Sequence, residues 1–316
     1  MDKLYTFGKY LKEKFNTKVK KVPISIPGFT CPNIDGTVAR GGCVFCENES
    51  FSPNFTKEKF SLNLNSKENP LLDKQLKSLE FQFFNTLPTL KKLYGAKKFI
   101  VYFQSFTNTY APFETLKVLY EKALSFPDVI GISVGTRTDS IEDKTLEYLK
   151  ELSKNYEIWI EYGIQTSNNK TLKKINRGHN FQNVIETITK TKDMGLNVCG
   201  HLIFGLPGET QEDMLKSVKD SIKLGIDSIK FHPLYVTQNT LLALEYKKGT
   251  FSPITEELYI DTLIKAIKML PQNISIQRMT AGTENLLAPK WCKNKSTQMS
   301  HIIKALNKAE IQTIWR

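Results

Sequence analysis

The strongest constraint on the fold is a regular alternation, along most of the chain, between short apolar segments and longer amphipathic segments. The short segments are rich in β-branched and aromatic residues and predict strands at 22–26, 98–104, 129–134, 157–163, 196–204 and 228–234. The longer segments space their apolar residues three or four positions apart and predict helices at 71–94, 112–125, 141–154, 181–194, 211–224 and 255–270. Six strand–helix units in series indicate a parallel sheet with right-handed crossovers.

Six units are two fewer than a closed eightfold barrel needs, so we expect an α/β fold of the incomplete (β/α)6 barrel type, open on one side. A doubly wound sheet is the alternative. The barrel is expected over residues 21–270, after a basic amphipathic helix in residues 1–20. Residues 271–316 are expected to form a short C-terminal α/β extension that covers the barrel, with a strand at 273–277 and a helix at 298–308.

The net charge indicates an anionic partner. The 316 residues include 44 Lys and Arg against 32 Asp and Glu, a formal charge of +12, and nucleic acid is the first candidate for such an excess. Lysines gather at 12–21, 91–98, 173–174 and 290–295, and we expect the first, third and fourth groups to border the open mouth of the barrel. We expect a cytoplasmic protein without membrane contact, because no segment has the roughly 20 apolar residues of a membrane span.

Three of the five cysteines lie close together. Cys31, Cys43 and Cys46 fall within sixteen residues after the first predicted strand, whereas Cys199 and Cys292 stand alone and are expected to be buried core thiols. Three thiolates can bind iron or zinc, but a structural zinc site normally has four ligands, and no fourth is near in the sequence. Three cysteines suit a [4Fe–4S] cluster with one iron left open. The spacing alone leaves zinc and unliganded thiols as alternatives.

Polar residues also follow the other predicted strands, at the edge where parallel barrels place their chemistry. The second strand runs into the polar turn 104–109, and the fifth runs into a Gly-Leu-Pro-Gly-Glu turn. Arg137 and Gln165 follow the third and fourth strands, and His232 ends the sixth. Each has a structural alternative: a turn that caps a helix, an ordinary strand-to-helix turn, a surface arginine or a structural histidine.

Several short motifs, taken together in their order along the chain, resemble those of the radical S-adenosylmethionine (SAM) superfamily. The resemblance spans nearly the whole chain, through PGFTCPNIDG, RGGCVFC, YFQSFTNTYAP, GISVGTRTDS, EYGIQTSNNKTLKKINRGH, HLIFGLPGE, IKFHPLYV and LAPKW. The C-x11-C-x2-C spacing departs from the superfamily's usual C-x3-C-x2-C. It is similar to that of the elongator-catalytic-subunit-like branch, and especially of the YhcC/YtqA-type family. Ile34 and Thr138 stand where that family tends to carry Arg and Pro.

The resemblance implies the cofactors and their ligands. Cys31, Cys43 and Cys46 would hold a [4Fe–4S] cluster, and SAM would bind beside it. The implied SAM contacts are Phe45 and Gly205 near the adenine, Gln104, Ser105 and Thr107 near the methionine amine, Gln165 and Arg177 near the ribose and the carboxylate, and Arg137. Glu161 would be either a ribose ligand or a structural partner of Arg137.

The resemblance also implies an activity. Reductive cleavage of SAM would give a 5′-deoxyadenosyl radical that abstracts a substrate hydrogen, with electrons from a flavodoxin- or ferredoxin-like donor. The implied substrate is tRNA, at the side chain of a wobble uridine. The same chemistry on a small metabolite or a protein is the second hypothesis, and a zinc-binding RNA module is the third. Because water would quench a radical, we expect few titratable groups at the mouth.

Overall fold

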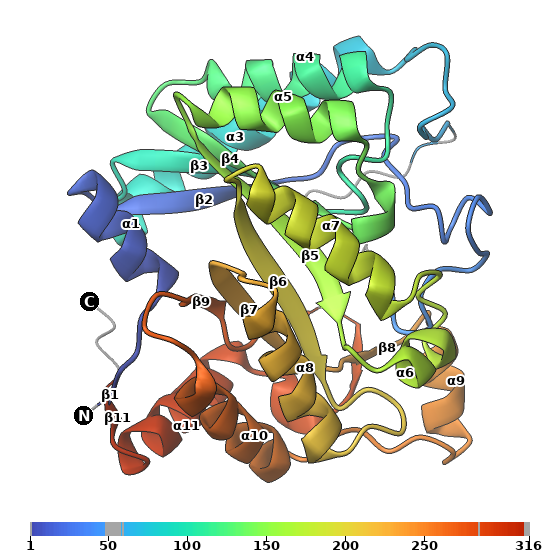
Figure 1. Ribbon diagram of the computed structural model, residues 1–316, viewed down its shortest axis with the longest axis vertical. Coiled ribbons are helices and arrows are strands. Elements are labelled where there is room, and N and C mark those ends of the chain that lie inside the picture. Colours follow the sequence, from blue (N-terminus) through green and yellow to red (C-terminus); the bar gives the residue numbers. More distant parts are fainter. Residues whose placement is uncertain (1, 48–57, 59, 284, 313–316) are drawn as a thin grey trace.

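The computed structural model describes residues 2–47, 58, 60–283 and 285–312, and a parallel sheet forms its centre (Figure 1). Within these residues the sheet has seven strands in chain order. They are β2 (Val19–Ile24), β3 (Lys98–Phe103), β4 (Val129–Thr136), β5 (Glu157–Gln165), β6 (Asn197–Phe204), β7 (Ser228–Pro233) and β9 (Ser275–Arg278). The sheet curls into an open half-barrel, which is an incomplete α/β barrel.

Helices cover the outer face of the sheet (Figure 1). They are α3 (Leu72–Tyr94), α4 (Phe113–Leu124), α5 (Asp143–Ser153), α7 (Phe181–Asp193), α8 (Gln211–Lys223) and α10 (Glu256–Met269). Their apolar stripes pack on outward side chains of the strands in one core, where Phe83, Phe99 and Phe103 are fully buried. The hydroxyls of Thr210 and Thr255 accept backbone N–H groups and so begin α8 and α10.

The six expected strands are confirmed, and a seventh is added from the C-terminal segment. β9 pairs in parallel with β7, which places Ser275 beside Ser228. The expected start of the first strand at residue 22 is wrong: β2 begins at Val19, because Lys20 and Lys21 interrupt the apolar pattern but belong to the strand. The division of the chain into an N-terminal helix, a barrel and an extension stays a prediction.

The remaining elements lie outside the central sheet and its covering helices. α6 (Asn169–Lys174) follows β5, and β8 (Val236–Thr237) follows β7, so both lie at the carboxyl ends of the strands. β8 pairs with β10 (Leu286–Ala288), and α9 (Leu241–Lys247) packs next to it. The other elements are α1 (Phe7–Phe15), α11 (Lys295–Lys308), the 3-10 turns η1 (Thr138–Ser140) and η2 (Lys290–Cys292), and the paired strands β1 (Asp2–Lys3) and β11 (Ile311–Gln312). Among the described helices, none combines the length and apolarity that crossing a membrane requires.

Helix α1 closes the amino-terminal end of the barrel, which we call the floor. The ring of Phe7 meets the indole of Trp159 edge-on with centroids 5.0 Å apart, and Tyr10 meets the same indole at 5.6 Å. Tyr10 Oη and Trp159 Nε1 both donate to Glu157 Oε1, at 2.6 and 2.8 Å. Because Glu157 and Trp159 lie at the start of β5, α1 is far from the carboxyl ends. The expectation that the lysines of this helix border the mouth is therefore wrong; its apolar face is held at the floor.

Replacing Trp159 by Ala should leave a cavity at the floor and lower the free energy of unfolding. Trp159 is 1% exposed, and deleting a buried aromatic side chain typically costs about 3–5 kcal/mol of unfolding free energy. Urea unfolding followed by circular dichroism measures that loss. Phe81→Ala is the matched control, because its ring is 70% exposed and the expected change is within about 0.5 kcal/mol. Equal losses in the two variants would contradict a packed floor.

Candidate active site

The loop after β2 brings three thiols to one pocket. They line a cavity of about 160 Å³ at the carboxyl ends of β3, β4 and β5, and they belong to Cys31, Cys43 and Cys46. The loop is held by Asn33, whose fully buried Nδ2 donates to the carbonyl oxygen of Asn176 at 2.5 Å and to that of Arg177 at 2.9 Å. The thiol loop is thereby fastened to the segment after α6, far along the chain.

Two arginines reach the sulfur atoms. Arg137 Nη1 lies 3.7 Å from Cys31 Sγ, and Arg177 Nη1 lies 3.8 Å from Cys43 Sγ. Asp139 orients the first guanidinium through two hydrogen bonds, from Nε at 2.7 Å and from Nη2 at 2.5 Å. Cationic donors beside thiolate sulfur stabilise its negative charge, and such contacts tune metal–sulfur groups. The surroundings of the thiols therefore suit an anionic metal–sulfur centre.

The spread of the three thiols distinguishes between metals. Thiolates around one zinc ion lie about 2.3 Å from it and hence close to one another. In the described residues, the group whose ligand atoms all lie within 4.8 Å of each other is Glu161, Cys199 and His201, not the loop cysteines. Thiols that are further apart but line one pocket fit a [4Fe–4S] cluster, in which each thiolate binds a separate iron. The single-zinc alternative is not supported.

The pocket gathers most of the other predicted residues. Its lining includes Gln104, Thr107, Arg137, Glu161, Gln165 and Arg177. Three predicted residues lie outside the lining. Phe45 packs on a small apolar cluster, Ser105 is buried, and Gly205 faces Ile254, whose Cβ would be 2.7 Å from a Cβ added to the glycine. Their contacts with SAM stay predictions.

Two pocket residues have left-handed backbone conformations that non-glycine residues rarely adopt. The φ angle is 63° at Phe106 and 68° at Gln165. Gln165 directly follows a register shift between β5 and β6 that begins at Gly163. Such conformations persist where surrounding contacts enforce them, and they cluster at ligand sites. The polar turn that contains Phe106 does not cap α4, whose N-cap is Pro112 without a side-chain bond.

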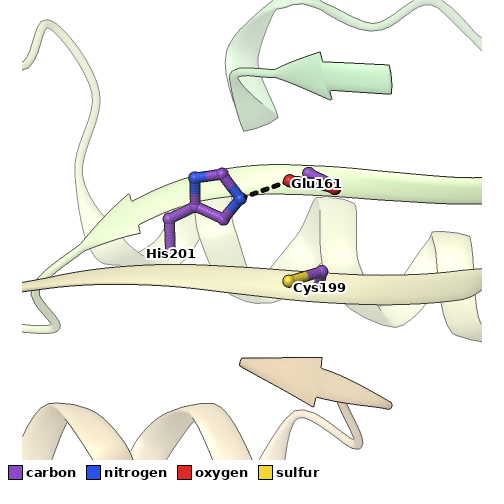
Figure 2. A group of neighbouring side chains, drawn as sticks. All are labelled: Glu161, Cys199 and His201. Carbon is purple, nitrogen blue, oxygen red and sulfur yellow. Dashed lines mark hydrogen bonds and ion pairs between the residues drawn. The ribbon is translucent and has the colours of Figure 1, made fainter. Parts of the chain in front are cut away.

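In the lining of the pocket, the fully buried carboxylate of Glu161 is bound from several strands. Lys21 of β2 and Lys230 of β7 each form an ion pair with it, and Ser133 Oγ of β4 donates to it at 2.6 Å. The Nε2 atom of His201, on β6, lies 2.7 Å from Glu161 Oε2 (Figure 2). Burial by itself would raise the pKa of Glu161, but Lys21 and Lys230 hold that pKa well below its ordinary value. Glu161 is therefore an ionised anchor in the barrel interior.

Glu161, His201 and Cys199 lie close enough to share a metal ion (Figure 2). A metal ion there would have to displace the ammonium groups of Lys21 and Lys230 from the carboxylate. Burial also raises the pKa of Cys199 to about 12, so that it remains a protonated thiol rather than the thiolate that metals bind. We therefore interpret this group as part of an ionic network.

One expectation about the interior is wrong, and one of the two alternatives for Glu161 is not supported. Few titratable groups were expected at the mouth, but Glu161 and His201 line the pocket and Lys230 lies directly behind them. Arg137 was offered as a partner of Glu161, but it pairs with Asp139, which follows it in the same turn. The signal that could have indicated the interior network is strand alternation, since every second side chain of a barrel strand points inward.

Comparison with known proteins identifies the class. The sequence-family model of the radical SAM superfamily matches residues 35–221 of this chain, and the family model of the radical SAM C-terminal domain matches residues 226–308. The protein YhcC of Escherichia coli (strain K12) is 35% identical over 97% of this chain and 93% of its own length. YtqA of Bacillus subtilis (strain 168) is 33% identical over 96% of this chain and 89% of its own length. The chain belongs to the radical SAM superfamily and, within it, to the family of YhcC and YtqA.

Two further similarities are more distant. A tRNA uridine(34) acetyltransferase of Methanocaldococcus infernus is 29% identical over 48% of this chain and 28% of its own length. The solved structure of M. infernus Elp3 with an N-terminal deletion has a TM-score of 0.63 at 18% identity, over 92% of this chain and 64% of that one. This chain thus spans less than two thirds of the Elp3 structure, which shares its fold. As a radical SAM enzyme, the protein uses a [4Fe–4S] cluster and SAM.

Removing a thiol of the loop should remove the cluster. We predict that alanine at Cys31, Cys43 or Cys46 lowers iron from about four atoms per chain to near zero after anaerobic reconstitution, because an open-iron cube needs all three thiolates. Iron analysis and the visible absorbance of the cluster measure the loss. Cys199→Ala and Cys292→Ala are the controls and should keep their iron, since both thiols are buried elsewhere. A Cys43→Ala protein with full iron content would show that the ligands are misassigned.

Adding one methyl group at Gly163 should weaken SAM binding without removing iron. A Cβ there would lie 2.6 Å from Gln165 Nε2 and 2.9 Å from Arg177 Nη2, so both side chains must move. Losing polar contacts of about 1–3 kcal/mol weakens binding roughly 5- to 150-fold, which calorimetry on reconstituted Gly163→Ala measures. Gly8→Ala is the control, with its nearest neighbour 3.9 Å away. Unchanged affinity in Gly163→Ala would argue against SAM contacts at these two residues.

Proposed function

We propose that this enzyme modifies tRNA at a wobble uridine, in the cytoplasm, with a flavodoxin- or ferredoxin-like protein as electron donor. The observation that carries the proposal is a set of exposed basic side chains on the elements at the mouth. The set, which we call the mouth cations, consists of Arg40, Lys173, Lys174, Lys247, Lys248, Lys290 and Lys293.

The mouth cations come from separate parts of the chain that meet at the carboxyl ends of the strands. Arg40 belongs to the thiol loop, and Lys173 and Lys174 belong to α6, which follows β5. Lys290 and Lys293 follow β10, which pairs with β8 just beyond β7. In Figure 1, α6 and α9 lie near the carboxyl ends of the strands, whereas α1 lies at the opposite end of the sheet. A phosphate backbone lying across this surface would meet cations on several sides of the pocket.

The similarity to a tRNA uridine(34) acetyltransferase over about half of the chain supports the same substrate class. It comes from a different enzyme type and supports only the choice of tRNA. The second candidate function is radical chemistry on a small molecule or a protein, and the polar interior behind the pocket favours a small group that enters it. Membership in the superfamily excludes the third hypothesis, a zinc-binding RNA module without catalysis.

In this proposal each part of the pocket has one task. Cys31, Cys43 and Cys46 hold the cluster, and Arg137 stabilises its charge from the side of Cys31. Gln165 and Arg177 orient the ribose and the carboxylate of SAM, while Gln104 and Thr107 bind its amine. When bound, the cluster and SAM supply a 5′-deoxyadenosyl radical for hydrogen abstraction. The closed floor under the pocket limits access of water from the opposite end.

Charge reversal on the two ends of the barrel tests the proposal. Lys174→Glu, Lys290→Glu and Lys293→Glu together should weaken tRNA binding and reduce the slope of log K against log salt by about 2–3, at ~0.7–0.9 per phosphate contact. The matched control reverses three exposed lysines at the floor, Lys12, Lys18 and Lys97. Both triple variants have the same net charge, so a general electrostatic effect would alter them equally. Filter binding over a range of salt concentrations measures both quantities.

Two outcomes would contradict the choice of tRNA as substrate without contradicting the radical chemistry. If the triple variant at the mouth had the same tRNA affinity and the same salt dependence as the triple variant at the floor, the mouth cations would not be the tRNA-binding surface. If undermodified tRNA also failed to stimulate SAM cleavage over fully modified tRNA, the tRNA proposal would be wrong, and the second candidate would take its place.

A further inference from the structure

The long gap between the first two cysteines of the thiol loop forms a small hairpin. The eleven residues between Cys31 and Cys43 double back on themselves, with a backbone bridge between Asp35 and Arg40. We call residues 34–40 the thiol-loop hairpin, and nearly all of them are exposed. Binding a cluster requires the cysteines but not an exposed hairpin between them, so the hairpin requires an explanation of its own.

Contacts at both ends of the thiol-loop hairpin fix its position. Tyr110 Oη donates a hydrogen bond to Thr37 Oγ1 at 2.7 Å, and Asn176 Nδ2 donates to the carbonyl oxygen of Arg40 at 3.1 Å. A surface that is fixed before a partner arrives loses less conformational entropy on binding. The hairpin is therefore a preorganised surface.

Two aliphatic side chains are exposed on the thiol-loop hairpin. Ile34 is 41% exposed and Val38 is 44% exposed, and Ile34 also lines the pocket beside Cys31. Exposed apolar side chains that are rimmed by polar groups are typical of protein interfaces. The phosphates of a nucleic acid would find no hydrogen-bond donor in either side chain. The aliphatic pair therefore favours a protein over RNA as the occupant.

The charge beside the aliphatic pair is mostly positive. Arg40 ends the hairpin, and Lys173 and Lys174 belong to α6, just before the asparagine that binds the carbonyl oxygen of Arg40. The hairpin itself contains one carboxylate, Asp35, whose Oδ1 accepts the backbone N–H of Thr37 at 2.9 Å. Complementary charge accelerates the encounter of two proteins and excludes wrong partners. The protein that fits this surface is therefore acidic.

The thiol-loop hairpin is also directly connected to a predicted cluster ligand. The backbone N–H groups of Ile34 and Asp35 both donate to the carbonyl oxygen of Cys31, at 2.8 and 3.1 Å. Electron transfer between proteins slows steeply as the distance between the redox groups grows. A redox protein that docks on Ile34 and Val38 would place its redox group near the thiols, which is the position that electron transfer requires.

We propose that the thiol-loop hairpin is the docking surface for a small acidic protein that reduces the cluster. In this step the redox group of the donor loses one electron and the cluster gains it, and no atom is transferred. Ile34 and Val38 make the apolar contact, while Arg40 and the lysines of α6 attract the acidic partner. The inference rests on the electron donor of the proposed function, but not on the substrate being tRNA.

Replacing Val38 by Glu tests the docking surface. The probes are a bacterial flavodoxin and a plant-type ferredoxin, and calorimetry on the anaerobic, cluster-loaded enzyme measures their affinity. Val38→Glu should weaken the binding of the donor at least about tenfold, because it places a like charge in the apolar contact. Val38→Ser removes the aliphatic contact without adding charge and should weaken binding by a smaller factor.

The source of electrons provides a second readout. Val38→Glu should cleave SAM more slowly than wild type when a limiting amount of reduced flavodoxin or ferredoxin supplies the electrons. With dithionite, a small reductant that needs no docking surface, the two proteins should cleave SAM at the same rate. A loss that is equal with both sources would show damage to the site rather than to docking, and would overturn the proposal.

Leu258→Glu is the matched control. Leu258 lies on α10 and is 41% exposed, so this variant loses a similar aliphatic surface and adds the same charge, and it should bind the donor as wild type does. Equal donor binding by wild type and Val38→Glu would overturn the docking surface and leave the donor class intact. Weaker tRNA binding by Val38→Glu with unchanged donor binding would assign the hairpin to RNA instead.

Failure of the proposed donor would be visible separately. If neither flavodoxin nor ferredoxin bound wild-type enzyme or supported its SAM cleavage while dithionite did, the donor class would be wrong, and this inference would fail with it. These results are independent of the salt dependence of tRNA binding.

Discussion

The interior of this protein depends on one buried carboxylate. Glu161, on the central strand β5, is contacted by Lys21 of β2, Ser133 of β4, His201 of β6 and Lys230 of β7. An ionised carboxylate is stable in such a place only because the opposite charges and hydrogen-bond donors around it compensate for lost hydration. The network therefore connects strands on both sides of β5. It also restricts which side chains these strands can place in the barrel interior.

At the mouth, buried polar side chains and arginines fix the position of the thiol loop. The thiol loop has little regular structure, and its position follows from the bonds of Asn33 to two carbonyl oxygens after α6 and from the two arginines beside the sulfur atoms. These contacts join the end of β2 to the ends of β4 and β5. Because the floor is apolar and closed by α1, the barrel has one polar, accessible end, where the thiols and the mouth cations lie.

Much of the fold follows from local patterns, and the errors have physical causes. Strand and helix positions could be predicted because apolar periodicity reflects burial on one face. The start of β2 was misplaced, since a lysine that points into the barrel has the same sequence signature as one in water. The seventh strand was recognised as a strand, but its pairing with β7 is a contact between distant segments. One of the two alternatives for Glu161, a partnership with Arg137, is not supported because Asp139, two residues from Arg137, binds that guanidinium within a local turn.

The sequence by itself predicted a parallel α/β barrel from its alternating segments, and the resemblance of its ordered motifs to the radical SAM superfamily indicated the class of protein, because both are local properties of the chain. It also determined which side chains follow the strands and so gather at the mouth. The tertiary structure decided which lysines are available to a partner and which neutralise Glu161. It also decided that α1 lies at the floor, away from the pocket. Those outcomes depend on charge compensation and packing between strands far apart in the chain, which no local pattern records.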